Sequence, residues 1–269
     1  MKVSIVTISF NQAQFLERAM RSVLTQDYPD VEYIVVDPGS TDGSRALIAT
    51  QGSRIKAILD KDNGPADGLN KGFAAATGDI FGYINADDAF LPGALREAVA
   101  AFERDPSADV ISGHSYVVDK DARILRPGFS DRFGLVRRAH GSATLLQQST
   151  FFRRQAFLDA GGFNTENHTC WDGELMVDMA MAGKQFRVVD RFWALFTLHP
   201  GGISGSGRLL ERYMQDEHRL FRKIMGRDRR ALDAVPDAAF RALRLASHPA
   251  HTLRLLYGRV AGERGRIDV

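Results

Sequence analysis

The chain has 269 residues, of which 44% are hydrophobic and 25% are charged, a composition that is ordinary for a soluble globular protein. This length is enough for one large α/β domain with an appendage. The opening residues lack the apolar core of a signal peptide, and no apolar run reaches about 18 residues, so we expect neither a secretion signal nor a membrane span. Cys170 is the single cysteine, which excludes an intrachain disulfide and fits the reducing cytoplasm.

Charge is divided unevenly along the chain. Residues 205–269 hold 14 Lys and Arg against 8 Asp and Glu, whereas residues 1–204 hold 21 against 25. The Gly- and Ser-rich stretch GGISGSG, from Gly201 to Gly207, separates the two parts and has the composition of a hinge. We therefore expect an acidic main domain over residues 1–204 and a basic helical C-terminal extension over residues 205–269.

Short apolar runs that are typical of buried strands alternate with helical patterns in the first hundred residues. This alternation predicts an α/β fold whose central sheet is mostly parallel, with right-handed crossovers. In such sheets, ligands bind beyond the carboxyl ends of the strands. In chain order we predict a strand at 3–8, a helix after Asn11, a strand at 33–37, a helix through Ile48, a strand at 55–59, a helix at 64–78, a strand at 80–84 and a helix from Pro92.

Polar side chains follow three of these predicted strands. A single Asp after a strand is usually a helix cap, but three polar groups at one rim of a sheet indicate a ligand site. Adjacent carboxylates repel and are costly to bury, and their hard oxygens suit Mg²⁺ or Mn²⁺ bound together with substrate phosphates. The three groups are Thr7, Ser9 and Asn11, then Asp37, Ser40 and Asp42, and finally Asn85, Asp87 and Asp88.

The loop after the first strand reads SFNQAQ, which excludes the common nucleotide-binding loops. It lacks the G-x-G-x-x-G pattern of a dinucleotide fold, and the chain contains no G-x-x-x-x-G-K-[ST] phosphate loop. The Gly-rich basic loop that is usual in nucleotidyltransferases is also missing.

Four blocks of the sequence together resemble family 2 glycosyltransferases of the GT-A fold. The resemblance runs in order over roughly residues 2–204. It implies a nucleotide-diphosphate sugar donor, a hydroxyl acceptor, inversion at the anomeric carbon, and Mn²⁺ or Mg²⁺ as cofactor. It also implies a hexosyltransferase-like enzyme of cell-surface polysaccharide or glycolipid synthesis, with a saccharide or a lipid-linked saccharide as acceptor. The blocks are VTISFNQAQFLERAMRSVLTQDYPDVEYIVVDPGSTDGS, KDNGPADGLNKGFAAATGDIFGYINADDAFLPGAL, QQSTFFRRQAFLDAGGFN and WDGELMVDMAMAGKQF followed by LFTLHPGGIS.

The resemblance also implies roles for single residues at the donor end. Asp37 would bind the nucleobase, with Thr7, Ser9 and Asn11 lining the nucleoside pocket. Asp87, in the NADD stretch, would be the metal ligand, and Asn85 stands where the family's metal motif usually has its first Asp. His199 would lie near the metal or the diphosphate, although a single His is often structural. The donor-binding set is Thr7, Ser9, Asn11, Asp37, Asp67, Asn70, Asn85 and Asp88.

At the acceptor end, Asp172 is the candidate catalytic base, with Trp171 in place of the usual Glu. It would take the proton from the acceptor hydroxyl. The alternative is that Asp172 only caps a helix. We expect Trp171, Glu174 and Gln148 to contact the acceptor, and Glu174 could also replace Asp172 as the base.

The basic extension has apolar residues at helical spacing between Leu210 and Met225, and Pro236 and Pro249 open two further helical stretches. Its helices could pack on the main domain with their arginines in water. Alternatively, they could form a basic amphipathic surface that rests on anionic lipid and brings a cytoplasmic enzyme to the inner face of a membrane. Sparse aromatic residues argue against nucleic acid as a partner.

A second function stays open at this stage. Asn85 and Trp171 replace residues that the family usually has, so the chain could be a catalytically inactive module that only binds nucleotide-sugars.

Overall fold

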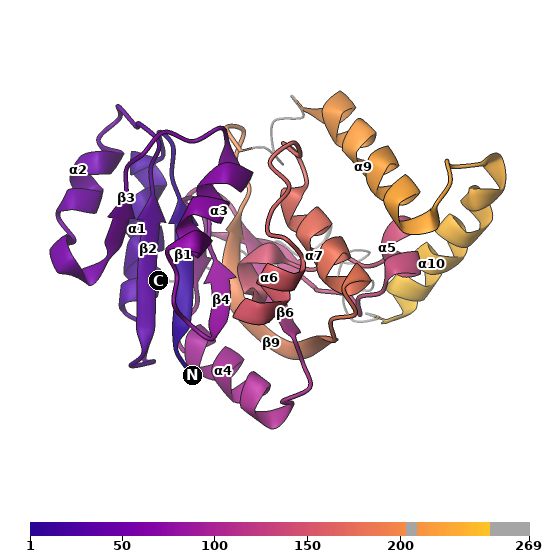
Figure 1. The fold of residues 1–269 in the computed structure, drawn as a ribbon, viewed down its shortest axis with the longest axis horizontal. Helices are drawn as coiled ribbons and strands as arrows, with labels where there is room; N and C mark the ends of the chain where they lie inside the picture. The colour runs from indigo at the N-terminus through magenta and orange to yellow at the C-terminus, as the bar shows by residue number, and fades with distance from the viewer. Residues whose placement is uncertain (203–208, 248–269) are drawn as a thin grey trace.

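The computed structural model describes residues 1–202 and 209–247, and within these residues nine strands form one sheet flanked by helices (Figure 1). The fold is α/β, as predicted. The strands are β1 (Val3–Ile8), β2 (Val31–Val36), β3 (Lys56–Ile58), β4 (Ile80–Tyr83), β5 (Ala89–Phe90), β6 (Val110–Val118), β7 (Ile124–Gly128), β8 (Thr150–Arg153) and β9 (Phe186–Thr197). The α-helices are α1 (Ala13–Leu24), α2 (Ser44–Ala49), α3 (Pro65–Ala74), α4 (Ala94–Arg104), α5 (Leu135–Ala139), α6 (Arg154–Asp159), α7 (Trp171–Met181), α9 (Leu210–Met225) and α10 (Ala234–Ser247).

The sheet has a parallel half and a mixed half. Strands β3, β2, β1 and β4 lie side by side and run parallel, as the sequence predicts. Beyond β4, β8 runs antiparallel to both β4 and β6, while β9 runs parallel to β6 and antiparallel to β5. The strand order is β3-β2-β1-β4-β8-β6-β9-β5, with β7 paired to β6. The carboxyl ends of β1, β2 and β4 therefore meet at one rim.

The parallel half is buried on both faces, which is why its strands read as continuous apolar runs. On β1, Val3 and Ile5 belong to a core cluster with residues of α1 and α4. Val6 points to the other face, into a cluster with residues of α3, α6 and α7. Helix α3 packs so closely there that a Cβ on Gly72 would lie 2.5 Å from Val6 Cγ1.

The pairing of β5 with β9 brings two distant segments together at the rim. Ala89 lies opposite Leu195 and Phe90 opposite Ala194. The chain before β5 is the 85–88 turn, and the chain after β9 leads to His199. The acidic turn and the histidine therefore lie side by side although more than a hundred residues separate them.

Helices α9 and α10 lie beside α5 and α7, at the end of the molecule opposite α2 and β3 (Figure 1). Pairs of polar side chains join them to the rest of the chain, among them Arg138–Glu217, His140–Asp237, Glu174–Arg219, Asp178–Lys223 and Asp131–Arg244. Only part of the predicted apolar face of α9 is covered, since Phe221 is buried whereas Leu210 and Met214 are exposed. The expected division after residue 204 and the helix expected from Pro249 lie outside the described residues.

Glu174 is the centre of the contact between α7 and α9. Its carboxylate is fully buried and accepts two hydrogen bonds of 2.6 Å from Arg219 and one of 2.7 Å from Asn167. Burial would raise the pKa of this carboxyl, but the hydrogen bonds from Arg219, Asn167 and Asn164 outweigh it and lower the pKa to about 2. Glu174 therefore holds the extension onto the helix that carries Asp172.

We expect Glu174→Gln to lower the free energy of unfolding by about 1.5–3 kcal/mol at neutral pH, because a charged hydrogen-bonded group is lost. The loss should lie near the lower limit, since the Arg219 side chain is 40% exposed and solvent screens it. The folded pKa of about 2 lies below the ordinary 4.5. The advantage of the wild type is therefore complete above pH 4.5 and fades as the pH falls toward 2.

Urea denaturation at several pH values measures this effect, with Glu211→Gln, an exposed change on α9, as the matched control. A difference between wild type and Glu174→Gln that stays constant down to low pH would contradict the account.

Candidate functional site

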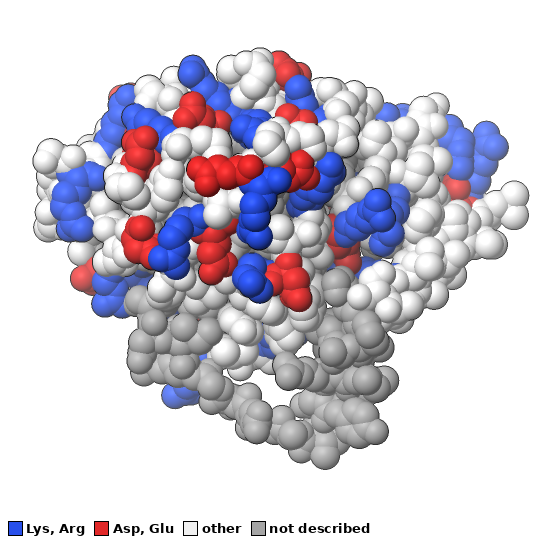
Figure 2. Space-filling model, turned by 90° about the horizontal axis from the view of Figure 1, so that it is seen from below, with Lys and Arg blue, Asp and Glu red and all other residues white. Residues whose placement is uncertain are grey.

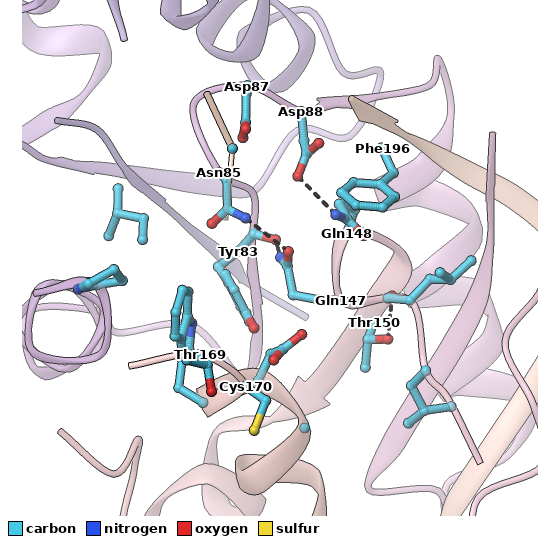
Figure 3. Close-up of a pocket in the computed structure, with 18 of the residues that line it drawn as sticks. Tyr83, Asn85, Asp87, Asp88, Gln147, Gln148, Thr150, Thr169, Cys170 and Phe196 are labelled. Atoms are coloured by element: carbon cyan, nitrogen blue, oxygen red, sulfur yellow. Dashed lines mark hydrogen bonds between the residues drawn. The ribbon is translucent and has the colours of Figure 1, made fainter. Parts of the chain in front are cut away.

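A cavity of about 1090 Å³ opens at this rim. Its lining runs from Ser9 and Pro38 at one end, past the 85–88 turn and Asp172, to Tyr213 of α9 and Arg244 of α10 at the other. Figure 3 shows Asp87 and Asp88 on one side of the pocket and Thr169 and Cys170 on the opposite side, with Tyr83 and Gln147 between them. The extension therefore forms part of the cavity wall, which the sequence did not predict.

Asp37 directly follows β2 and is completely buried; it is not among the cavity-lining residues, but the next residue, Pro38, is. Asp37 Oδ1 accepts hydrogen bonds from the backbone of Gly39 and Ser40, at 3.0 and 2.8 Å, and from Arg45 Nε at 3.2 Å. Its Oδ2 is buried and has no hydrogen-bond partner among the described residues. An unpaired buried carboxylate oxygen is costly, so Oδ2 is an acceptor suited to an N–H group of a ligand.

Ser9 lies near Asp37 and lines the cavity as predicted, and its hydroxyl is likewise buried without a partner among the described residues. Two other residues of the predicted nucleoside pocket do not line the cavity. Thr7 is fully buried on β1 and accepts a hydrogen bond of 3.0 Å from Tyr33. Asn11 adopts a φ of 52° and accepts the Thr41 N–H at 2.9 Å. Asn11 thus fixes the loop after Asp37 rather than capping α1.

Asp67 and Asn70, on α3, also have structural partners away from the cavity. Asp67 accepts the Asn63 N–H at 2.9 Å. Asn70 exchanges two hydrogen bonds with the backbone of Phe163, at 2.8 and 2.9 Å. The residues of this region that do line the cavity are Lys61, Asp62, Gly64 and Pro65, which lie before and at the start of α3.

The 85–88 turn is fixed from three sides. Asp88 is buried, with Oδ1 accepting the Thr197 N–H at 2.8 Å and Oδ2 accepting Gln148 Nε2 at 2.9 Å (Figure 3). Burial and the neighbouring Asp87 raise the pKa of this carboxyl well above its usual value. From α1, Arg18 donates hydrogen bonds of 2.8 Å to the Asp87 carbonyl and to Thr197 Oγ1. Arg18 thus joins the acidic turn to the end of β9.

Two glutamines of the short helix after Leu146 complete this support. Gln147 donates to the Tyr83 carbonyl at 2.8 Å and accepts from Asn85 Nδ2 at 3.3 Å. Gln148, the predicted acceptor contact, lines the cavity but holds Asp88. The position of Asn85 and Asp88 therefore depends on both glutamines.

Asp87 and His199 both line the cavity, and Asp87 Oδ2 lies 3.0 Å from His199 Nε2. The His199 ring packs against Phe15, with 4.8 Å between ring centroids. The carboxylate oxygen of Asp87 is a donor that suits Mg²⁺ or Mn²⁺, whereas an imidazole nitrogen is more usual with other divalent metals. The described residues contain no group of three or more acidic, His or Cys side chains that could hold a metal. The pair thus fits an ion whose remaining ligands come from substrate phosphates and water.

Asp172 lines the opposite part of the cavity. It is the second residue of α7, whose N-cap is Cys170, so the alternative that Asp172 is the N-cap is wrong. Burial raises the pKa of Asp172, and the Gly173 N–H and the Arg138 guanidinium offset this only in part. A partly buried carboxylate with a raised pKa has the properties of a general base.

Trp171 and Glu174 flank Asp172 in different ways. Trp171 lines the cavity, and its Nε1 is buried without a partner among the described residues. Glu174 is not among the cavity-lining residues, and Arg219 engages both of its oxygens. This placement argues against Glu174 as an acceptor contact or as the base.

Sequence reasoning missed Arg18, Arg138 and Glu217. Arg18 lies three residues after Phe15 and four before Ser22, which are both on the buried face of α1. This spacing places Arg18 on the same face of the helix and could have predicted that it points into the protein. Arg138 and Glu217 belong to segments far apart in the chain, and their contact depends on how α9 docks.

The described residues contain no helix that is long and apolar enough to cross a membrane.

Comparison with known proteins agrees with this architecture. The model of glycosyl transferase family 2 matches residues 4–162. An uncharacterized glycosyltransferase of Nostoc sp. is 29% identical over 212 residues, which are 74% of this chain and 65% of the relative. A GalNAc(5)-diNAcBac-PP-undecaprenol beta-1,3-glucosyltransferase of Campylobacter jejuni is 33% identical over 99 residues, 35% of this chain and 32% of the relative. The chain thus spans less than two thirds of these relatives.

Two solved structures share the fold. S. aureus TarS 1–349 in complex with UDP-GlcNAc superposes with a TM-score of 0.69 at 18% identity, covering 98% of this chain and 77% of that one. The mannosyltransferase PcManGT of Pyrobaculum calidifontis, in complex with GDP-Man and Mn²⁺, gives 0.64 at 19% identity, covering 97% and 76%. The fold is therefore that of GT-A glycosyltransferases.

Proposed function

Because the chain belongs to glycosyl transferase family 2, we propose that it is a glycosyltransferase that moves a sugar from a nucleotide-diphosphate donor to a hydroxyl acceptor. The observation that carries this proposal is the set of groups at one cavity. Ser9, the Asp87–His199 pair and the candidate base Asp172 line the same cavity, and the buried Asp37, with one carboxylate oxygen that has no partner among the described residues, directly precedes the lining residue Pro38.

The donor would lie along the rim of the parallel strands. Asp37 Oδ2 would accept an N–H of the nucleobase, with Ser9 beside it. The diphosphate would reach Asp87 and His199, which would hold a divalent cation; that cation would neutralise negative charge on the leaving group. Relatives in this fold have been solved with UDP-GlcNAc and with GDP-Man and Mn²⁺, which supports a donor of this class.

Asp172 would act on the acceptor. As the sugar leaves its diphosphate, the acceptor oxygen forms a bond to the anomeric carbon, and its proton passes to the Asp172 carboxylate. Attack from the face opposite the leaving group inverts the anomeric centre. Trp171, with its unpaired indole N–H, would hold a sugar ring of the acceptor by an apolar contact and a hydrogen bond.

The acceptor that we favour is a saccharide on a lipid carrier. The Campylobacter relative is named for transfer to an undecaprenol-linked saccharide. Exposed apolar side chains on α9 and near the start of α10 support a membrane contact, with Leu232 79% and Val235 69% exposed. Apolar contact by these side chains would hold the protein at a cytoplasmic membrane face. On the face shown in Figure 2, acidic and basic side chains are interspersed.

Asp172→Asn keeps the size of the side chain but removes its ability to take a proton. We expect kcat to fall by about 10²–10⁴-fold, with donor affinity and melting temperature near those of the wild type. Transfer assays with nucleotide-sugars and an acceptor measure this, with the exposed Asp121→Asn as control. Undiminished turnover would remove Asp172 as the base, and absence of any transfer or donor hydrolysis by the wild type would favour an inactive binding module.

Asp37→Asn should weaken binding of UDP or GDP, whichever the wild type binds, by about tenfold or more. The reason is that a hydrogen bond to a charged group contributes about 1.5–3 kcal/mol. Calorimetric titration measures the dissociation constant, with Asp30→Asn as an exposed control. An unchanged constant would show that the nucleobase lies elsewhere.

Mn²⁺ should bind the protein weakly alone and more tightly with a nucleoside diphosphate, because two protein donors are too few for a closed site. Electron paramagnetic resonance of free Mn²⁺ reports this binding without relying on activity. Asp87→Asn should abolish the nucleotide-dependent part. Full transfer activity in excess chelator would instead show that the enzyme works without metal.

Binding to anionic vesicles should weaken when Leu232 and Val235 are both changed to Ser, because less apolar surface enters the membrane. Leu125→Ser, at a side chain 48% exposed on β7, is the control. Co-sedimentation that is equal for all three proteins would leave these residues without a membrane role.

A further inference from the structure

An ion pair between α5 and α9 lines the cavity beside Asp172. Arg138 donates to both carboxylate oxygens of Glu217, at 2.9 and 2.6 Å. The two side chains are only 14% and 27% exposed, and both residues line the same cavity as Asp172. Two parallel hydrogen bonds fix the guanidinium plane, so Glu217 determines where the charge of Arg138 lies.

The guanidinium lies against the first turn of α7. A Cβ added to Gly173 would lie 3.3 Å from Arg138 Nη2, which is the nearest described atom apart from the adjacent residues and the backbone of α7 itself. Gly173 follows Asp172 directly, and the lack of a side chain there lets the positive charge approach the helix start. A glycine at position 173 therefore allows Arg138 to contact the start of α7.

Five titratable groups face Asp172 from the surrounding segments. Arg138 comes from α5, Glu217 and Tyr213 from α9, Tyr83 from β4, and Cys170 precedes α7. Arg138 is the positively charged member of this set, and Glu217 is the other carboxylate. An opposite charge nearby favours an ionised carboxylate, whereas a like charge disfavours it.

We propose that Arg138 and Glu217 are positioning residues that together set the proton affinity of Asp172. Burial disfavours the ionised form of the Asp172 carboxyl, and the positive charge of Arg138 favours it. Glu217 moderates the effect of Arg138, so the C-terminal extension adjusts the base that α7 carries. This inference rests on the proposed function, in which Asp172 is the base.

The directions of the pKa shifts agree with this arrangement. Burial raises the pKa of Asp172, Arg138 lowers it and Glu217 raises it. Removing Arg138 should therefore raise the pKa of Asp172, and removing the charge of Glu217 should lower it. Changing both should give a value between those of the two single variants.

The direct test is a ¹³C NMR titration of aspartate-labelled full-length protein, with the Asp172 signal identified by its loss in Asp172→Asn. We expect Arg138→Met to raise the pKa of Asp172 by about one unit or more. Glu217→Gln, which preserves shape, should lower it measurably. Arg212→Met, which removes an exposed positive charge from α9, is the control for long-range effects.

If Arg138→Met does not fold, Glu217→Gln and Arg138→Lys replace it in the titration. A lysine keeps the positive charge but loses the paired hydrogen bonds to Glu217. The acid limb of the kcat–pH profile should move in the same direction as the pKa. A pKa of Asp172 that stays within about 0.3 units of the wild type in folded Glu217→Gln and in the folded Arg138 variant would overturn the inference. Failure of the proposed function has a different signature: turnover would survive in Asp172→Asn whatever the titration shows.

Discussion

The rest of the site depends on how the protein accommodates the two carboxylates at the end of β4. Asp88 is buried and accepts hydrogen bonds from Thr197 and Gln148. Arg18 holds the Asp87 carbonyl and Thr197 together. Because these contacts join the chain after β4 to the end of β9, they also determine where His199 lies. Without them, two adjacent carboxylates would repel, and the turn would move toward water.

The two ends of the cavity are built from different parts of the chain. The proposed nucleoside end lies at the carboxyl ends of the neighbouring parallel strands β1 and β2, where one oxygen of Asp37 has no partner among the described residues. The acceptor end is assembled from α5, α7, α9 and α10, which charged pairs hold together. Since Tyr213, Glu217 and Arg244 line the cavity, the C-terminal helices are part of the site.

Sequence reasoning was most successful where local pattern decides structure. The first strand was predicted at the residues that form β1, and the strands that became β2, β3 and β4 were predicted within two residues at each end. Their polar ends placed Ser9, Asp37 and Asp87 at one rim. The mixed half of the sheet was not predicted, because its antiparallel pairings join segments that are far apart in the chain.

Side-chain direction was the main source of error in the site. Thr7 belongs to the strand that leads to the cavity, but a residue on a strand faces one side or the other, and Thr7 points to Tyr33. Asn70 and Glu174 are polar residues whose hydrogen bonds stabilise the fold. Asn70 bonds to the backbone of Phe163, and Glu174 bonds to Arg219. Arg138 and Glu217 carried no local signal, since their pairing exists only after α9 docks on α5.

The central claim is that one cavity holds a nucleoside diphosphate between Asp37 and the Asp87–His199 pair. Crystals grown with Mn²⁺ and UDP or GDP, measured for anomalous scattering at the manganese edge, test it most directly. The account predicts a single strong peak within coordination distance of the Asp87 carboxylate and the diphosphate, with the nucleobase against Asp37 Oδ2. A nucleotide bound elsewhere, or one bound here with its base away from Asp37 and its diphosphate away from Asp87, would contradict it.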